Sequence, residues 1–569
     1  MLSHGWRIAA PICLVISVVT FGCAAPPPGP QGAGSAPPAG TPAAAPSGPK
    51  RITAGIRGTA QVLYAKLNIG NAGLGVADVA LMVDAGLTAR DDQDMLHPEL
   101  AEGVPTIDNG DWKLFPDGRM ETTWKIRERA AWHDGTAFTA DDLLFTWQVV
   151  SDPALPVFSA PGFESVEDVE APDPRRVMVR WKQAFIYADQ MFSTALAVPM
   201  PRHVLERAYA DDKLGLPQHP YFTTEFVGTG PFKVKQFVPD SFVALTANDD
   251  YVLGRPKIDE IEVRFIPDAN TIMANLLSGT VQVVLDPRSL TSAQALQIKD
   301  QWTDGHFDFG RSSWVVMFPQ QISPNPPAMA DVRFRRALMH AINRKEMGEL
   351  APIPVQIADS WVGPDWVQYR DVQESIVPHP YDLQRANELL GELGYAKGAD
   401  EMYQNAAGQK LSVEVRVPGT DINLRSGQTV LDYWKQAGIG GELAVVPAQR
   451  TNDREYRSTY PGVELIRPGA AVDTFVNVKS TEIPLAERNW AGTNRQRYAS
   501  PALDTIIERY LTTIPPSARL DVLRDAVHFV GENLVYMGLI FDPPVLLISN
   551  RLKNVPPASL WNGHEWTFD

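Results

Sequence analysis

The sequence predicts an α/β fold divided among more than one domain. Beyond Lys50, strand-like runs alternate with helical patterns along the chain, and no internal repeat is evident. The chain has 569 residues, which is more than one compact core accommodates. Hydrophobic residues make up 44% of the sequence, enough to fill a large core. We therefore expect about two or three domains.

The first residues have the pattern of an export signal. A short segment with Arg7 precedes the apolar run IAAPICLVISVVTF, which is too short to span a bilayer comfortably and suits a signal-peptide core. The motif TFGCAA that follows resembles the lipobox of bacterial lipoproteins, although Thr20 and Phe21 depart from its usual pattern. We expect residues 1–23 to be a lipoprotein signal peptide with the lipid on Cys23. The alternative is an unmodified cysteine near an ordinary cleavage site.

Residues 24–50 are predicted to be a disordered tether. They are almost wholly Ala, Pro, Gly and Ser, which cannot bury enough apolar surface to offset the entropy of ordering. The rest of the sequence has no run of about 20 apolar residues, so we expect no transmembrane helix there. The sequence thus predicts an exported protein that a lipid holds at the outer face of the cytoplasmic membrane or in the periplasm.

The stretch AWHDGTAFTADDLLFTW is the first segment in which a catalytic and a structural interpretation compete. His133 stands beside Asp134, but neighbouring residues on one strand tend to point apart, whereas a catalytic base needs its partners brought together. The preceding TTWKIR alternates like a strand, and Asp134-Gly135 is a tight-turn dipeptide. Thr139 is then a candidate helix N-cap with Asp142 three residues on. We favour strand, turn and capped helix over a catalytic pair.

Further helices are predicted in the middle of the chain. The stretch DANTIMANLLSG has helical spacing and closes at Gly279, and YDLQRANELLGELGY closes at Gly394. The amphipathic stretch DVRFRRALMHAIN carries three arginines, and we expect a solvated helix face there, with an anion site as the alternative. These arginines are Arg333, Arg335 and Arg336.

Composition excludes several kinds of function. The formal net charge of −16 argues against nucleic-acid binding, which needs an excess of Lys and Arg. Both cysteines, Cys13 and Cys23, lie in the leader, so the body has no thiol for a disulfide, a zinc site or a nucleophile. The chain contains no HExxH, GxSxG or P-loop motif. We therefore expect no catalytic residues, no metal and no cofactor.

An ordered series of segments extends from near Ile52 almost to the C-terminus, behind the predicted lipoprotein leader. It includes LHPELAEG, TTWKIRERAAWHDGTAFTADDLLFTW, GTGPFKVKQFVPD, DVRFRRALMHAINRKEM, YDLQRANELLGELGY and YASPALDTIIERYL. In this order, the segments resemble those of the family 5 extracellular solute-binding proteins, which serve oligopeptide, dipeptide and nickel ABC importers.

The resemblance implies a two-lobed periplasmic-binding-protein type II fold with an additional inserted domain. Two crossing strands would join the lobes, and hinge closure would enclose a solute between them. The implied first lobe is discontinuous, and the inserted domain contains His133. The expected ranges are 51–95, 216–312 and 536–569 for lobe I, 96–215 for the inserted domain and 313–535 for lobe II.

The resemblance also directs attention to the stretch ELIRPGAAVDTFV in lobe II. Peptide-binding relatives commonly have an aspartate here that pairs with the peptide amino group. Aligned on Phe475, that position falls at Pro468, next to Arg467, so the usual anchor is expected to be absent. Arg467 would then face an anionic or neutral polar group of the ligand, unless it is a solvated loop arginine. Asp473 could instead replace the missing acid.

Aromatic residues are expected to supply flat walls of the cleft. Fourteen tryptophans are present, and for each candidate a place in the core is the competing interpretation. In SSWVVMFPQ, relatives often have Asn after the phenylalanine, where this chain has Pro319. The candidate aromatic residues are Trp314, Phe318, Trp361, Trp366 and Trp490.

The function expected from these patterns is ligand binding without turnover. The protein would be a monomeric, lipid-anchored receptor that captures a peptide-like or other small polar solute and delivers it to an ABC permease. One alternative is a lipoprotein that senses a ligand and signals to a membrane partner. The other is a secreted hydrolase.

Overall fold

The computed structural model describes residues 48–68, 75–310, 313–353, 355–451, 453–557 and 560–569. Residues 49–569 form one compact unit. The predicted signal peptide and the lipidation residue Cys23 lie outside the described residues, as does nearly all of the predicted tether. Within the described part, no helix is long and apolar enough to cross a membrane.

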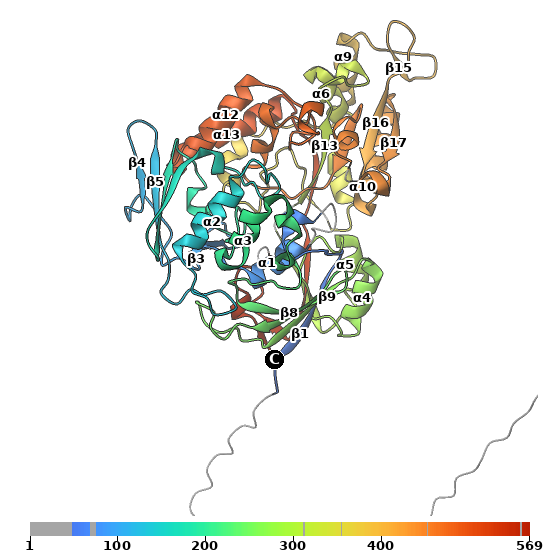
Figure 1. The fold of residues 1–569 in the computed structure, drawn as a ribbon. Helices are drawn as coiled ribbons and strands as arrows, with labels where there is room; N and C mark the ends of the chain where they lie inside the picture. Colours follow the sequence, from blue (N-terminus) through green and yellow to red (C-terminus); the bar gives the residue numbers. More distant parts are fainter. Residues whose placement is uncertain (1–47, 69–74, 311–312, 354, 452, 558–559) are drawn as a thin grey trace, which may run out of the picture. The chain divides into compact units, whose positions relative to one another are not determined.

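A seven-stranded mixed sheet contains the first and nearly the last strands of the chain (Figure 1). Its central strand β1 is parallel to both neighbours, β10 and β11. The helices whose apolar sides pack in the cores around this sheet are α1 (Val76–Val83), α4 (Ala269–Leu277) and α5 (Ser292–Ile298). In spatial order the strands are β12 (Gly305–Phe309), β20 (Val545–Ser549), β11 (Val283–Val284), β1 (Arg51–Ile56), β10 (Glu260–Phe265), β9 (Phe242–Ala247) and β8 (Phe232–Val238).

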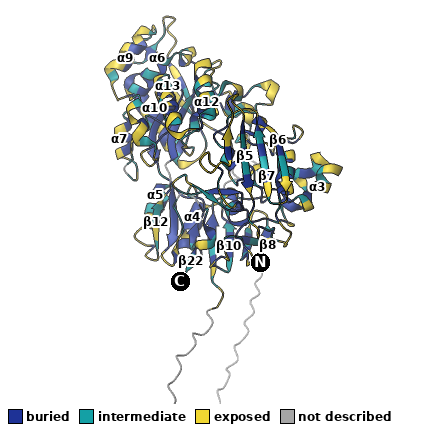
Figure 2. Cartoon of the chain, turned by 90° about the vertical axis from the view of Figure 1, so that its left-hand side faces the viewer, coloured by how far each residue is buried: buried dark blue, intermediate teal, exposed yellow. Residues whose placement is uncertain are grey.

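A four-stranded antiparallel sheet lies in the range expected for the inserted domain. In spatial order its strands are β4 (Trp112–Leu114), β5 (Met120–Lys125), β7 (Arg176–Trp181) and β6 (Val166–Asp173). Exposed residues are prominent on the outer side of its helix α3 (Figure 2). The same range contains α2 (Ala140–Val150), α3 (Arg202–Asp211) and β3 (Leu96–Pro98). The strand β3 pairs with β2 (Thr88–Arg90), which lies just before this range.

A five-stranded sheet lies at the centre of most of the rest of the chain. In spatial order its strands are β17 (Gly440–Val445), β16 (Ser412–Val417), β18 (Val463–Ile466), β13 (Ser313–Pro319) and β19 (Met537–Asp542). The helices in this part are α6 (Val332–His340), α7 (Arg344–Glu349), α8 (Tyr369–Val372), α9 (Leu383–Glu392), α10 (Asp421–Ala437), α11 (Arg454–Ser458), α12 (Pro501–Thr512) and α13 (Pro516–Glu532). Two short hairpins pair β14 (Ala396–Lys397) with β15 (Tyr403–Gln404) and β21 (Leu552–Lys553) with β22 (Thr567–Phe568).

The chain crosses between the seven-stranded and five-stranded sheets at two places. The first crossing follows β12 and leads into β13, and the second joins β19 to β20 through residues 543–544. The first coincides with the predicted boundary at 312. The second begins eight residues after the predicted end of lobe II at 535, because β19 pairs with β13. The division into domains as a whole stays a prediction.

The predicted turn and capped helix around His133 are confirmed. Trp132 N–H donates to Thr136 O at 2.8 Å, and Gly135 between them has a φ of +90°, which glycine adopts without a Cβ clash. Thr139 and Asp142 form a capping box at the start of α2. The carboxylate accepts the Thr139 backbone N–H at 2.9 Å, which satisfies a donor that a helix start leaves free.

The expectation of a solvated arginine face on α6 is wrong for Arg335. Its side chain is buried, and its guanidinium donates to Met329 O at 2.9 Å and to Asn533 O at 2.8 Å. Arg333 and Arg336 instead lie at the surface, where they pair with Asp331 and Glu532. Burial of Arg335 is tolerated because backbone carbonyls replace the hydrogen bonds of water.

Candidate functional site

Three of the predicted aromatic residues converge on one tyrosine that sequence reasoning missed. The ring centroid of Tyr536 lies 5.5 Å from that of Trp314, 5.4 Å from Phe318 and 6.4 Å from Trp361. Tyr536 directly precedes β19, and its hydroxyl donates to Thr474 O at 3.2 Å. Nothing in the local sequence marks Tyr536, because its role arises from the pairing of distant strands.

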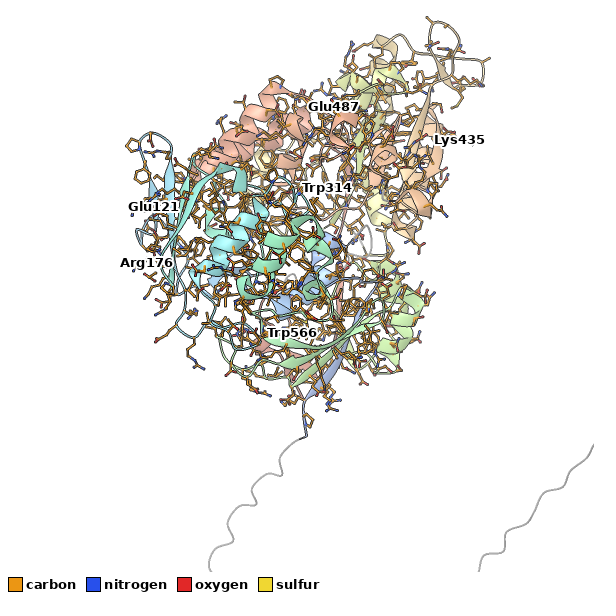
Figure 3. The ribbon with its side chains drawn as sticks, viewed as in Figure 1. Glu121, Arg176, Trp314, Lys435, Glu487 and Trp566 are labelled. Carbon is orange, nitrogen blue, oxygen red and sulfur yellow. The ribbon has the colours of Figure 1, made fainter. Side chains whose placement is uncertain are left out.

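Most of the predicted cleft aromatics are buried in the core of this structure. Trp314 and Trp361 are each 1% exposed and Trp366 is 7% exposed. Figure 3 shows Trp314 surrounded by other side chains. Trp490 is half-buried, with the guanidinium of Arg497 5.7 Å from its ring centroid. Their role as walls of a ligand cleft stays a prediction.

Arg467 forms a buried ion pair at the second crossing between the sheets. It follows β18, and its Nε donates to the carboxylate of Asp542 at the end of β19, while Nη2 donates to Asp542 O at 3.0 Å. The other oxygen of Asp542 accepts from the Ser292 hydroxyl, at the start of α5, at 3.4 Å. Asp542 therefore ties the five-stranded sheet to a helix of the seven-stranded one, and it neutralises the charge expected to face a ligand.

Asp473, at the other end of the same loop, contacts the segment that follows β7. The Tyr187 hydroxyl donates to the Asp473 carboxylate, and the neighbouring Ile186 N–H donates to Leu511 O at 3.0 Å. Burial and the charge of Asp473 raise the pKa of Tyr187 well above its usual value, and they raise that of Tyr510 to about 12. The loop 467–473 thus touches both the sheet crossing and the predicted inserted domain.

His133 has a structural position. Its Nδ1 accepts the Gly228 N–H at 3.1 Å, and its Nε2 donates to Gly230 O at 3.0 Å. Burial lowers its pKa to about 4, so the ring is neutral at pH 7. The imidazole therefore joins the turn at residues 133–135 to the segment that leads into β8.

The structure also contains a cavity of about 290 Å³ that includes none of the predicted site residues. The helix α1, the β2–β3 hairpin, the short 3-10 helix around Ala65 and the turns at residues 190–198 form its walls, which are mostly apolar. No local pattern indicates this cavity, because its walls come from stretches about 100 residues apart. The lining residues are Leu63, Tyr64, Ala65, Lys66, Ala77, Ala80, Leu81, Asp84, Thr88, Arg90, Leu96, Gln190, Ser193, Thr194, Ala195, Leu196 and Val198.

A buried acid stands in the wall of this cavity. Asp84 is 4% exposed, and burial and the nearby Glu99 raise its pKa to about 8. Burial also raises the pKa of Glu99 to about 7. The hydrogen bonds that Glu99 accepts from Gly86 N–H and the Tyr251 hydroxyl act in the opposite direction and lower its pKa, but burial has the larger effect. Over the described ranges, no three His, Cys, Asp or Glu side chains are grouped to hold a metal ion.

The seven-stranded and five-stranded sheets are joined by two crossings of the chain, and the four-stranded sheet is inserted before the first crossing. This arrangement defines a two-lobed binding protein. The family model for bacterial extracellular solute-binding proteins, family 5 Middle, matches residues 96–474. The chain therefore belongs to family 5 of the bacterial extracellular solute-binding proteins. Members of this family are extracytoplasmic, bind solutes for ABC transporters and are not enzymes, which removes the hydrolase alternative.

Individual relatives agree with this assignment. A putative ABC transporter peptide-binding protein of Brucella ovis is 26% identical over 473 residues, which cover 78% of this chain and 80% of the relative. Among solved structures, the oligopeptide-binding protein of Thermus thermophilus with a pentapeptide has a TM-score of 0.72 at 20% identity, covering 91% and 96% of the two chains. The periplasmic EDTA-binding protein EppA has a TM-score of 0.76 at 18% identity, covering 91% and 96%. These structures support the two-lobed α/β fold.

Proposed function

We propose that this protein is a lipid-anchored extracytoplasmic receptor that captures a peptide-like or other small polar solute between its lobes and delivers it to an ABC permease. The observation that carries the proposal is the loop 467–473. It contacts Asp542 at the sheet crossing and Tyr187 in the predicted inserted domain. A hinge motion would make or break the contact with Tyr187, so the loop is placed to couple ligand binding to closure.

The names of the relatives support this ligand class. The Brucella relative is named as peptide-binding, one structural neighbour holds a pentapeptide, and another is named as EDTA-binding. Peptides and EDTA share a polar, multiply hydrogen-bonding character. A peptide or a compact polar solute is therefore the class to test.

Within the loop, Asp473 is better placed than Arg467 to meet a ligand charge. Arg467 is paired with Asp542, which weakens the expectation that it faces an anionic ligand group. Asp473 accepts a hydrogen bond from a neutral hydroxyl, that of Tyr187. A ligand amine could take the place of that hydroxyl, and a charge-assisted bond between the amine and the carboxylate would be the stronger of the two.

Calorimetry with a short peptide, its N-acetylated form and its C-terminally amidated form tests this assignment. We expect the free peptide to bind, and acetylation or Asp473→Asn to weaken binding at least tenfold. Asp152→Asn is the matched control, because Asp152 also accepts from a tyrosine hydroxyl, that of Tyr209, at 2.7 Å. Selective weakening by C-terminal amidation and by Arg467→Gln would return the anchor role to Arg467.

Small-angle scattering and product analysis test the receptor function itself. We expect the particle to contract when ligand binds, and the melting temperature to rise by mass action, with about 2.7 kcal/mol of stabilisation at a hundredfold excess over Kd. Steady conversion of the bound solute by pure protein would contradict the proposal.

The lipid anchor is tested at Cys23, in the motif TFGCAA. Cys23→Ala should move the protein from the membrane pellet to the soluble fraction, because a lipid on this cysteine would be its attachment. Fractionation and intact mass give the readout. A variant that stays in the pellet with unchanged mass would show that the anchor lies elsewhere.

A further inference from the structure

The 290 Å³ cavity lies apart from the junction of the two large sheets. Every residue that lines it belongs to the ranges 63–96 and 190–198, and none belongs to the five-stranded sheet or its helices. A solute in this cavity would contact α1, the β2–β3 hairpin and the stretch after β7. The cavity is therefore a separate compartment from the loop 467–473.

Two buried polar atoms in the wall have no hydrogen-bond partner within the described part of the chain. They are Asp84 Oδ1 and Ser193 Oγ, and each residue is only 4% exposed. A buried polar atom without a partner destabilises a fold, so such atoms are uncommon and call for an explanation. The two residues come from separate segments and line the same cavity, so a bound molecule with hydrogen-bonding groups is one explanation for both.

The cationic side chains of the cavity are already engaged. Lys66 Nζ donates to Ser159 O at 2.9 Å and to Leu196 O at 3.1 Å, and Arg90 contacts Asp94 and Gln190. An anionic ligand would have to displace these contacts. Asp84 Oδ1 accepts no hydrogen bond within the described residues, so this side of the cavity favours a ligand with a hydrogen-bond donor or a positive charge.

We propose that this cavity binds a small primary amine with an apolar body. The ammonium group would donate to Asp84 and Ser193, and the apolar part would pack against Leu63, Leu81 and Leu96. The cavity holds the volume of about ten water molecules, which suits one aromatic or branched aliphatic amine. This site goes beyond the receptor function and does not depend on it.

Binding of such an amine should release a proton. Burial and the charge of Glu99 raise the pKa of the Asp84 carboxyl to about 8, which leaves it mostly protonated at pH 7, and the charge of Asp84 in turn raises the pKa of the neighbouring Tyr64 and Tyr221. An ammonium ion favours the ionised carboxylate and lowers that pKa. Amine binding at pH 7 should therefore release protons from the protein, up to one per bound amine.

The test is isothermal titration of the whole protein with three probes of similar shape: 2-phenylethylamine, 2-phenylethanol and 3-phenylpropanoate. The amine should bind at least tenfold more tightly than either other probe. Titrations in two buffers with different ionisation enthalpies count the released protons. Equal binding of the three probes, or no binding of the amine, would overturn the proposal.

Variants locate the binding site. Asp84→Asn should weaken amine binding at least tenfold and abolish proton release.

Ala77→Phe fills the cavity from an exposed position on α1, so it should block the amine even if Asp84→Asn fails to fold. Asp259→Asn, at an exposed ion pair with Arg255, is the matched control and should leave amine affinity unchanged. Unchanged amine affinity in Ala77→Phe would place the amine elsewhere and overturn the proposal. Peptide binding retained in Ala77→Phe would show that the two sites are independent.

Discussion

The two buried acids Asp542 and Asp84 have opposite surroundings. Both are nearly inaccessible, at 9% and 4% exposure. The carboxylate of Asp542 is held by Arg467 and Ser292, whereas Asp84 Oδ1 has no partner in the described residues. A buried charge that is paired within the protein joins parts of the fold. A buried acid without such partners either stays protonated or needs a ligand to supply its hydrogen bond.

Removing the cation at the sheet crossing should have the largest effect on stability. Arg467→Ala leaves the Asp542 carboxylate buried without its counter-ion, so we expect the free energy of unfolding to fall by about 3–5 kcal/mol. Denaturant unfolding measures the change. Adding Asp542→Asn should recover part of the loss, because the unpaired charge is then gone.

The exposed pair Arg385 and Glu388 provides the control for that experiment. Arg385→Ala should cost about 1 kcal/mol or less, because solvent screens an exposed ion pair. If Arg467→Ala were no more costly than Arg385→Ala, the ion pair at the crossing would have no structural role.

Replacing Asp84, the acid in the cavity wall, should stabilise the protein. The folded protein holds the Asp84 proton up to about pH 8, whereas the unfolded chain releases it near pH 4. Between these values the folded state binds more protons, so this group lowers stability as pH rises. Asp84→Asn should flatten that decline and raise the free energy of unfolding at pH 8 by about 1–3 kcal/mol.

Unfolding curves between pH 5 and pH 8 give the measurement, with Asp259→Asn as a surface control. An Asp84→Asn variant less stable than the wild type at pH 8 would mean that the carboxylate has a partner within the fold. The comparison between the two buried acids would then fail.

The smallest expected effect on ligand affinity is that of His133→Ala. The variant loses the hydrogen bonds to Gly228 and Gly230, so the free energy of unfolding should fall by about 1–2 kcal/mol while peptide affinity stays within about twofold. The pKa of His133 is lowered to about 4, against about 6.5 in the unfolded chain. The neutral His133 ring therefore contributes fully to the free energy of unfolding above pH 6.5, and this contribution is lost as the pH falls toward 4. A hundredfold loss of affinity at unchanged melting temperature would contradict the structural assignment.

Local structure and family membership could be predicted from the order of residues alone. The turn at Gly135 and the cap formed by Thr139 and Asp142 depend on residues within a few positions of each other. Turn and cap preferences are properties of the nearby backbone, so they can be inferred without the rest of the chain. The ordered series of such segments identified the two-lobed class.

Which charged groups are buried, and with which partners, depends instead on the tertiary fold. Arg467 and Asp542 lie 75 positions apart, and the cavity brings Asp84 to within reach of the stretch around Ser193. Arg335 has a surface-like sequence pattern but is buried, because a carbonyl 198 residues away accepts one of its hydrogen bonds. Burial and partnership depend on which strands pair across the whole chain, and local propensity carries no information about distant partners.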